Sequence, residues 1–241
     1  SNPASLLHNP AKVMGRHDAE PLKRGISSVS WQSGTQHYMT LPFSPYQEIA
    51  AIIDRFTGAD GNFSTAISNL SFYRHSAPTM PHHSAYRPGF AIVVQGAKSL
   101  TVGQEIYRYG AGQYLLTSLD LPVESHVTEA TPEAPYLCLT YTIDSARLSD
   151  MIARVSIPRQ ATAEGIRGWA VNIASPEILD ASVRLLRLLD RPDDIEAVAP
   201  LIEQEILYRL LSGPDGPRLL QIAMSESQSN KVVRAIAWIR D

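Results

Sequence analysis

The sequence predicts an α+β fold, in which a mainly β region forms a small barrel or sandwich and a run of helices follows it. Three observations predict this class. Short runs rich in β-branched and aromatic residues, separated by Gly and Pro turns, fill residues 65–143. After Asp144, apolar residues recur at the three- and four-residue spacing of amphipathic helices. The composition of the 241 residues, 44% hydrophobic and 19% charged, excludes a collagen-like, disordered or disulfide-rich chain.

A helix is expected before the β-region. Residues 1–43 show no clear apolar period and are expected to form an arm or loop. Ser44 is a suitable N-cap, Pro45 suits the first helical position, and Gln47 is placed for a capping box. Gly58 is a typical C-terminal stop. The apolar stripe of this helix comprises Ile49, Ile52, Ile53 and Phe56.

The β-region is expected to hold about six short strands. Phe90–Val94 is a buried strand that ends at Gln95-Gly96, and Leu100–Tyr109 is a hairpin that turns at Gly103-Gln104. A strand at Tyr114–Thr117 follows the Gly110–Gly112 turn. A further pair of strands is expected at 123–128 and 136–143.

The last of these strands has a clear two-residue alternation. One face carries Leu137, Leu139, Tyr141 and Ile143, and the other carries Cys138, Thr140 and Thr142.

From Asp144 onward the pattern predicts helices only. They are expected at 148–155, at 176–189 behind the Ser175 cap, and at 193–212, with shorter pieces at 217–224 and 232–239. The expected divisions are therefore an arm at 1–43, a barrel domain with its leading helix at 44–144, a helical region at 145–212, and residues 213–241. The 176–189 helix carries leucines around more than half of its circumference, at Leu185, Leu186, Leu188 and Leu189. Because one face can pack on the barrel and the rest would stay exposed, this predicts a homodimer through the 176–190 or 197–212 helix.

Charge and apolar patterning narrow the classes of partner. The formal net charge of −3 gives no electrostatic footprint for nucleic acid. No uninterrupted apolar run exceeds five residues, whereas a membrane span needs about 18, and no signal-peptide core is visible at the N-terminus. We therefore expect a cytoplasmic protein with no membrane partner. The single cysteine, Cys138, is expected to be a buried, inert thiol.

No catalytic motif, phosphate loop or dinucleotide fingerprint is present. His82 and His83 with His126 are the one set of residues that a barrel could use for a divalent metal. However, no Asp or Glu follows His83 before Glu105, and adjacent residues on a strand face opposite sides. The sequence therefore predicts no catalytic residue, no metal and no cofactor.

Polar and aromatic side chains gather in the β-region and could partly line the interior of a barrel, as a ligand pocket requires. The set comprises Arg74, His75, Tyr86, Arg87, Gln95, Lys98, Tyr107, Tyr109, His126 and Tyr141. Strand alternation turns only about half of them inward. The ligand-binding candidates are Arg74, Tyr86, Gln95, Tyr107, Tyr109, His126 and Tyr141.

A series of short motifs extends through the chain from Phe43 to Ser212. In order they are Tyr73-Arg74, Tyr86-Arg87-Pro88, Val93 to Lys98, Gly103, Tyr107-Arg108-Tyr109, Gly112 to Leu115, Leu121-Pro122-Val123, Pro135-Tyr136-Leu137 and Asp144. Gln-Gly-x-Lys, Tyr-x-Tyr and Pro-Tyr-Leu in this order are the most specific part. In this combination the sequence resembles the N-terminal half of AraC-type transcription regulators.

The resemblance implies a cupin-like, effector-binding barrel with a helical dimerisation region behind it. Lys231–Asp241 resembles the first helix of the family's DNA-binding half, and the two helix-turn-helix motifs that the family places next are absent from this sequence. We therefore expect the sensor domain of a longer regulator, which takes an unidentified small-molecule effector, forms a homodimer, meets DNA only through the missing half and is not an enzyme. Two alternatives are a metal-dependent cupin enzyme, such as an oxygenase or isomerase, and a scaffold that only dimerises.

Overall fold

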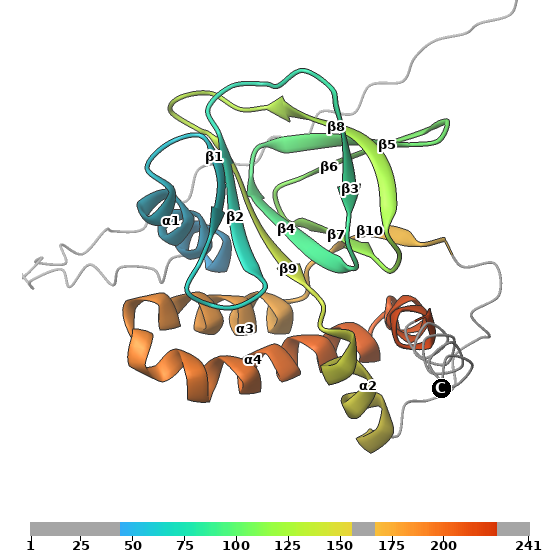
Figure 1. Ribbon diagram of the computed structural model, residues 1–241. Coiled ribbons are helices and arrows are strands. Elements are labelled where there is room, and N and C mark those ends of the chain that lie inside the picture. The colour runs from blue at the N-terminus through green and yellow to red at the C-terminus, as the bar shows by residue number, and fades with distance from the viewer. Residues whose placement is uncertain (1–43, 156–166, 226–241) are drawn as a thin grey trace, which may run out of the picture. The chain divides into compact units, whose positions relative to one another are not determined.

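A computed structural model of the chain describes residues 44–155 and 167–225. All of them belong to one of the two compact units of the chain, residues 42–241. The predicted arm at 1–43 and the predicted helical piece at 232–239 lie outside the described residues. Two antiparallel sheets and a set of helices make up the described part, which confirms the α+β class (Figure 1).

The larger sheet has six strands in the order β1-β2-β9-β4-β7-β10, and every neighbouring pair is antiparallel. Its strands are β1 (Gly61–Ser64), β2 (Leu70–His75), β9 (Tyr136–Thr142), β4 (Gly89–Gln95), β7 (Gln113–Thr117) and β10 (Trp169–Ile173). The smaller sheet has four strands in the order β3-β8-β5-β6. They are β3 (His82–Tyr86), β8 (Leu121–Glu129), β5 (Ala97–Val102) and β6 (Glu105–Gly110).

The structure confirms the predicted hairpin, because β5 pairs with β6 around Gly103, which has a φ of +61°. Two β-sheet predictions need correction. The strands expected as a pair at 123–128 and 136–143 exist as β8 and β9, but they belong to different sheets. The expectation that only helices follow Asp144 is wrong, because β10 returns to the larger sheet and pairs with β7. Since β10 has five residues and only partial burial, its apolar pattern is too short to identify a strand.

Four α-helices are described up to Ser212: α1 (Pro45–Thr57), α2 (Ser145–Arg154), α3 (Pro176–Arg187) and α4 (Pro192–Ser212). The predicted capping box of α1 is present, since Ser44 Oγ accepts from Gln47 N and Gln47 Oε1 accepts from Ser44 N. Ser175 caps α3 as expected. α4 begins at Pro192, before the predicted start, so Asp193 and Asp194 lie in its first turn, where the helix dipole favours acidic residues.

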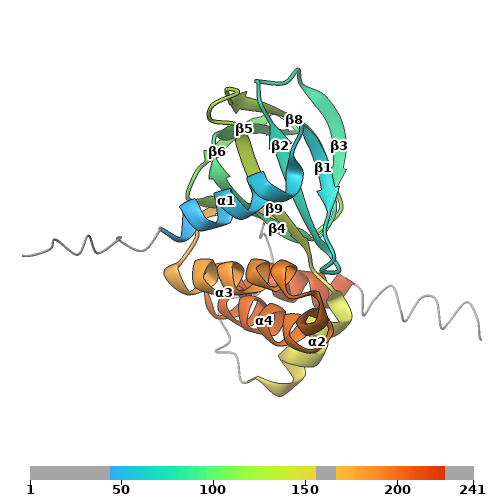
Figure 2. The same ribbon diagram turned by 90° about the vertical axis from the view of Figure 1, so that its left-hand side faces the viewer.

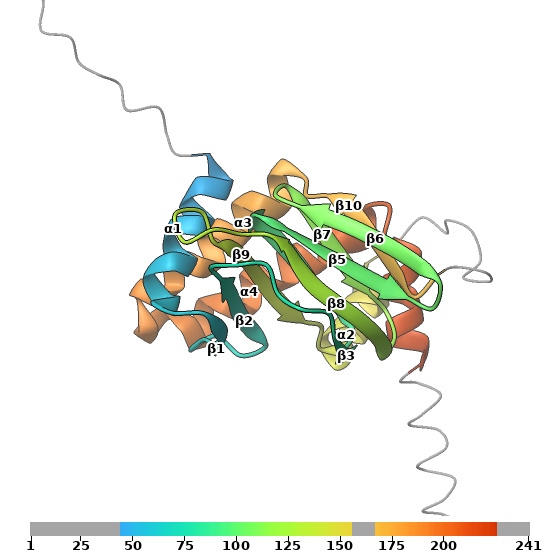
Figure 3. The same cartoon turned by 90° about the horizontal axis from the view of Figure 1, so that it is seen from above.

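Two hydrophobic cores lie on opposite faces of the larger sheet. One core lies between this sheet and the helices, and α1 and α3 pack together while α3 pairs with α4 (Figure 2). The other core lies between the two sheets, so the smaller sheet is on the side away from α3 and α4 (Figure 3). The alternation of β9 follows this division: Leu137, Leu139 and Tyr141 belong to the helix-side core, and Cys138 belongs to the core between the sheets.

The helices are more fully covered than the leucine pattern of α3 predicts. Leu185, Leu186 and Leu188 are all buried within the chain, because α3 lies between α1 and α4. Exposed large apolar side chains of this layer are instead found on α4, where Leu201 is 66% exposed and Tyr208 is 41% exposed, and at Phe56 of α1 and Met224 after α4.

A short segment after α4 is tied to the edge of the larger sheet. Residues 216–225 are helical, and the preceding Asp215 is fully buried. Its carboxylate accepts hydrogen bonds from the Tyr114 hydroxyl on β7, from Asn172 Nδ2 on β10 at 2.8 Å and from Arg218 Nη1 at 3.1 Å. These bonds fix the segment against the strand pair β7–β10.

Candidate functional site

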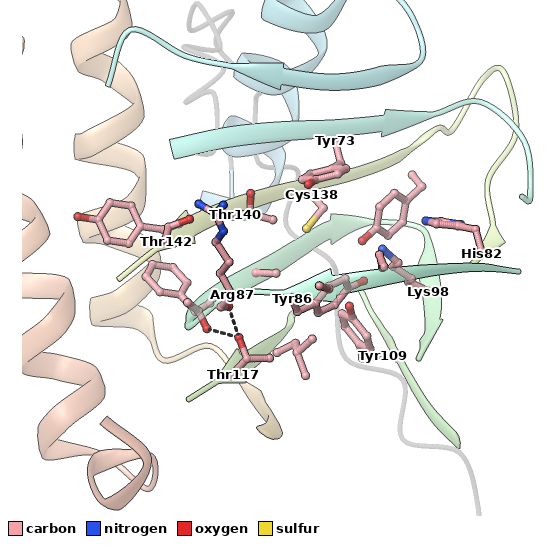
Figure 4. Close-up of a pocket in the computed structure, with 18 residues that line it drawn as sticks. Tyr73, His82, Tyr86, Arg87, Lys98, Tyr109, Thr117, Cys138, Thr140 and Thr142 are labelled. Carbon is pink, nitrogen blue, oxygen red and sulfur yellow. Dashed lines mark hydrogen bonds between the residues drawn. The ribbon is translucent and has the colours of Figure 1, made fainter. Parts of the chain in front are cut away.

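A cavity of about 320 Å³ lies between the two sheets (Figure 4). Both sheets contribute to its wall: β2, β4, β7 and β9 from the larger, and β3, β5 and β6 from the smaller. The lining residues are Tyr73, His82, Ser84, Ala85, Tyr86, Arg87, Gly89, Phe90, Ala91, Lys98, Tyr109, Leu115, Thr117, Tyr136, Cys138, Thr140, Tyr141 and Thr142. Apolar walls with a few placed polar groups are typical of small-molecule sites, and the volume is at the lower end of their range.

Strand alternation explains how the cavity obtains its polar groups. On β9, Cys138 and Thr140 face the smaller sheet, because their neighbours Leu137 and Leu139 fill the helix-side core. On β7, Leu115 faces the cavity while Leu116 faces the helices. The same strands therefore build the helix-side core with one face and the cavity with the other.

Tyrosines and Lys98 form one end of the cavity. Lys98 Nζ lies 5.3 Å from the centre of the Tyr86 ring and 6.0 Å from that of Tyr73, within the range of cation–π attraction. The Tyr86 hydroxyl donates to Ser125 Oγ at 3.2 Å. Burial raises the pKa of Tyr109 and of Tyr136 well above the usual phenol value, so both remain neutral donors at physiological pH. This end therefore presents neutral hydroxyls and one cation.

Arg87 and threonines form the other end. Thr117 Oγ1 donates to the backbone carbonyl of Arg87 at 2.7 Å, which fixes the connection between β3 and β4. The Arg87 side chain reaches toward Thr140, on the side of the cavity away from Lys98 (Figure 4).

Cys138 lies on the cavity wall as a buried thiol. Burial raises its pKa to about 11, and Tyr136 and Lys98 only partly offset this. The group is therefore protonated at neutral pH and is a weak nucleophile, as the sequence predicts for a buried thiol.

The structure brings three of the seven predicted ligand-binding residues to the cavity: Tyr86, Tyr109 and Tyr141. Tyr141 lies at its margin, since the ring packs against Phe90 at 5.5 Å within the helix-side core. Arg87 and Lys98, from the wider polar set, also line the cavity. Binding by any of them stays a prediction.

The other four predicted residues lie elsewhere and have structural partners. Arg74 forms ion pairs with Asp54 and Asp60. Gln95 Nε2 donates to the Pro135 carbonyl at 2.8 Å, which links the end of β4 to the start of β9.

The Tyr107 ring meets the Trp169 ring edge-on, with 6.0 Å between the ring centres. His126 is paired with Ser99 across β8 and β5 and does not line the cavity.

Tyr73, Tyr136, Cys138 and Thr140 are lining residues that the sequence did not identify as site candidates. The alternation of residues 136–143 contained the signal for Cys138 and Thr140, because it separated them from the leucine face. It did not show that this second face would meet a cavity, since that depends on how the two sheets pack.

The three histidines do not gather into one site. His82 lines the cavity, His83 lies 3.8 Å from Glu124 across the β3–β8 pair, and His126 lies outside the lining. Within residues 44–155 and 167–225, no group of three or more His, Cys, Asp or Glu side chains is arranged to hold a metal ion. No helix in this part of the chain is long and apolar enough to cross a membrane.

The fold and the cavity agree with what the sequence comparison finds. Residues 66–218 match the family described as AraC-type transcriptional regulator N-terminus, which is more than half of the chain. The chain therefore belongs to this family of regulator N-terminal domains, as the resemblance implied. No curated protein matches the sequence.

Solved structures with a similar fold are distant in sequence. An apo ToxT variant from Vibrio cholerae strain SCE256 has a TM-score of 0.44 at 8% identity over 61% of this chain and 57% of its own. The AraC-like transcriptional activator CuxR has a TM-score of 0.33 at 12% identity over 64% of this chain and 52% of its own. A cupin-2 domain protein from Shewanella frigidimarina has a TM-score of 0.25 at 12% identity over 37% of this chain and 90% of its own. The chain thus spans little more than half the length of the two regulators.

Proposed function

We propose that this chain senses a small-molecule effector in the cavity between its sheets and, as a dimer, controls DNA binding by a helix-turn-helix half of the same regulator. The observation that carries the proposal is the cavity itself. It lies between two sheets of a regulator domain, and its wall combines apolar side chains with a cation and several hydroxyl donors. Because a transcription regulator must reach DNA, we place it in the cytoplasm.

The test of effector sensing is thermal unfolding of the chain with a panel of small molecules. A ligand that binds only the folded state stabilises it, by about 2.7 kcal/mol when the ligand concentration is one hundred times its Kd. This stabilisation raises the melting temperature. Ala91 lines the cavity, and Ala91→Phe should fill it, so this variant should remain folded and lose the shift. A ligand whose shift survives in the Ala91→Phe variant binds elsewhere, and that result would contradict the proposal.

We infer that the dimer uses α4 rather than α3. Of the two helices that the sequence suggested, the argument from uncovered apolar surface applies to α4, since the leucines of α3 are buried within the chain. Leu201 and Tyr208 lie seven residues apart and therefore share one face of the helix. An exposed apolar stripe on a regulatory domain is typical of an interface.

Analytical ultracentrifugation tests this choice. The chain should sediment as a dimer at micromolar concentration, and Leu201→Glu should shift it to monomer. Ile173→Glu is the matched control, because Ile173 is 78% exposed but lies on β10. A wild-type monomer, or equal dissociation by both variants, would contradict an interface on α4.

We also propose that the domain catalyses no reaction and needs no metal. The dispersal of His82, His83 and His126 supports this. Metal analysis of the purified protein decides it: one equivalent of iron, zinc or manganese that is lost in a His82→Ala variant would favour a cupin enzyme instead.

A further inference from the structure

The cavity has an unbalanced charge. Its lining residues include the basic side chains of Lys98 and Arg87, and none of them is aspartate or glutamate. The imbalance is local, since the whole chain carries a formal net charge of −3. A chain with more acidic than basic residues therefore places basic but no acidic side chains among the lining residues of this cavity.

Neither cation has a carboxylate partner within 4 Å in the described residues. Most of the arginines in this part of the chain do have one: Arg74 pairs with Asp54, and Arg218 pairs with Asp215. Lys98 is half-buried, and the faces of Tyr73 and Tyr86 lie within cation–π range of its charge. Because burying a charge without a counter-ion is unfavourable, an anion beside Lys98 would be favoured at this position.

The neutral groups around Lys98 are suited to the same ligand. Tyr109 is 3% exposed and Tyr136 is 2% exposed, so both hydroxyls are removed from bulk water. Burial raises the pKa of both phenols, which keeps their protons available for donation. A phenol O–H and an ammonium N–H both donate to carboxylate oxygens, and such charge-assisted hydrogen bonds are about twice as strong as neutral ones.

We propose that the effector is a small organic carboxylate, whose carboxylate group binds Lys98 and whose apolar body contacts the wall formed by Ala91 and Leu115. This inference rests on the proposed sensing function and deepens it. The cavity of about 320 Å³ favours a body of one ring or a short alkyl chain. Arg87, which is exposed at the opposite end, contributes only long-range attraction.

The experiment compares three matched series by calorimetry and thermal unfolding of the chain. The carboxylates are benzoate, phenylacetate and hexanoate; the neutral series is benzyl alcohol, 2-phenylethanol and hexanol; and the cationic series is benzylamine, 2-phenylethylamine and hexylamine. The carboxylates should bind more tightly than their neutral counterparts by about tenfold or more, as expected for a hydrogen bond to a charged group. The amines should not bind.

Variants assign the effect to Lys98. Lys98→Met should weaken carboxylate binding about tenfold or more and leave alcohol binding unchanged, which shows that the cavity remains intact. Lys98→Arg should retain the preference for carboxylates. Arg87→Met is the matched control, and its loss should stay below about threefold because exposed charges interact weakly.

The single cysteine locates the ligand. Cys138 lies on the cavity wall, so a bound carboxylate should slow its modification by methyl methanethiosulfonate in the wild-type chain. The Lys98→Met variant should lose this protection at the same carboxylate concentration.

Three results would overturn the inference, and they separate it from the proposed function. If the alcohols bind as tightly as the carboxylates and protect Cys138, the cavity senses a neutral ligand, and only the charge assignment fails. If carboxylates bind equally to the Lys98→Met variant, the anion does not contact Lys98, and the assignment again fails. If no member of any series raises the melting temperature or protects Cys138, both the inference and the sensing function fail.

Discussion

The two faces of the six-stranded sheet are built from the same strands and have different properties. The face toward the helices is covered by aliphatic and aromatic side chains that pack closely, among them Phe72, Ile92 and Leu116, all at 0% exposure. The face toward the smaller sheet carries Tyr73, Tyr136 and Cys138 and leaves a cavity. Adjacent residues on one strand therefore serve stability on one side and the proposed effector site on the other.

The difference has a packing origin. Helices can settle against a sheet until aliphatic side chains fill the interface, because each helix is free to shift along the sheet surface. Two sheets joined by short turns have less freedom, and tyrosines that keep their hydroxyls near polar partners leave space between them. The comparison teaches that the cavity is a property of one face of the sheet, so it can be altered with limited effect on the other face.

The largest expected effect comes from truncating matched leucines on β7. Leu116→Ala should lower the free energy of unfolding by about 3–5 kcal/mol, because it opens a void in the filled core. Leu115→Ala should cost about 2 kcal/mol, since Leu115 already borders a cavity and fewer contacts are lost. Urea unfolding of the two variants measures the difference. Equal losses would show that the two faces are packed alike.

The second prediction concerns Asp215, a buried carboxylate on the otherwise apolar helix side of the sheet. Asp215→Ala should lower the free energy of unfolding by about 1–3 kcal/mol, because Tyr114 and Asn172 lose their buried acceptor. Tyr114→Phe should cost less, since Asp215 keeps Asn172 and Arg218. Urea unfolding and amide exchange of residues 216–225 measure the two losses. An Asp215→Ala variant with wild-type stability would mean that this segment does not depend on the carboxylate.

The third prediction tests how much α1, which covers part of the helix-side face of the sheet, contributes to the stability of the chain. Ser44→Ala removes the cap of α1 and should lower the free energy of unfolding by about 1 kcal/mol. Ser44→Thr, which keeps a hydroxyl, is the control and should lie near the wild type. Carboxylate or other ligand binding should be unchanged, since Ser44 does not line the cavity. A change in ligand affinity would show that the two faces are coupled.

The smallest expected effect is a pH dependence at Glu203. This residue of α4 is buried, and its Oε2 lies 2.5 Å from Arg147 Nη1. Burial raises the pKa of Glu203 above its usual value, despite the opposing effects of Tyr141 and Arg147. A raised folded-state pKa means that the folded chain holds the proton more tightly than the unfolded chain does, so protonation of Glu203 stabilises the fold. This contribution to stability is complete below the usual glutamate pKa and is lost as pH rises through the raised value.

Glu203→Gln should remove that dependence. Between the usual and the raised pKa, the wild type should lose stability with rising pH relative to the variant, and the difference at pH 7 should stay below about 1 kcal/mol because Arg147 is half exposed. Thermal unfolding from pH 4 to 7 checks the sign. A wild type that gains stability over this interval relative to Glu203→Gln would contradict it.

Local patterns predicted much of the helical and hairpin structure. The Ser44 capping box, the Ser175 cap and the Gly103 hairpin all depend on contacts within a few residues, and all three are present. The strand β10 could not be predicted in this way, because its five half-buried residues become a strand only through pairing with β7. Local patterns also could not show which polar side chains reach the cavity, because this depends on how the sheets pack. Of the predicted residues, Tyr86, Tyr109 and Tyr141 line the cavity. Gln95 and Arg74 are held by structural partners instead.

The motif Gln95-Gly96 shows how a recognisable pattern can be structural. Gly96 has a φ of +76°, and a Cβ there would lie 2.4 Å from the Glu129 carbonyl oxygen, so the close approach of chain segments requires glycine. Gln95 holds Pro135 beside it. The motif therefore helps to identify the family and shapes the corner between β4 and β5, while the cavity is lined by other residues.

The sequence by itself determined the fold class, the helix caps and the two faces of β9, because these follow from composition, spacing and contacts close along the chain. Its motifs also indicated the family, by their resemblance to known regulators. Only the tertiary structure decided which face of β9 meets a cavity and that β8 and β9 belong to different sheets. It also decided that Lys98 lies among tyrosines, with no carboxylate partner among residues 44–155 and 167–225. Each of these depends on side chains from strands far apart in sequence, and their positions are set by the packing of whole sheets rather than by any local preference.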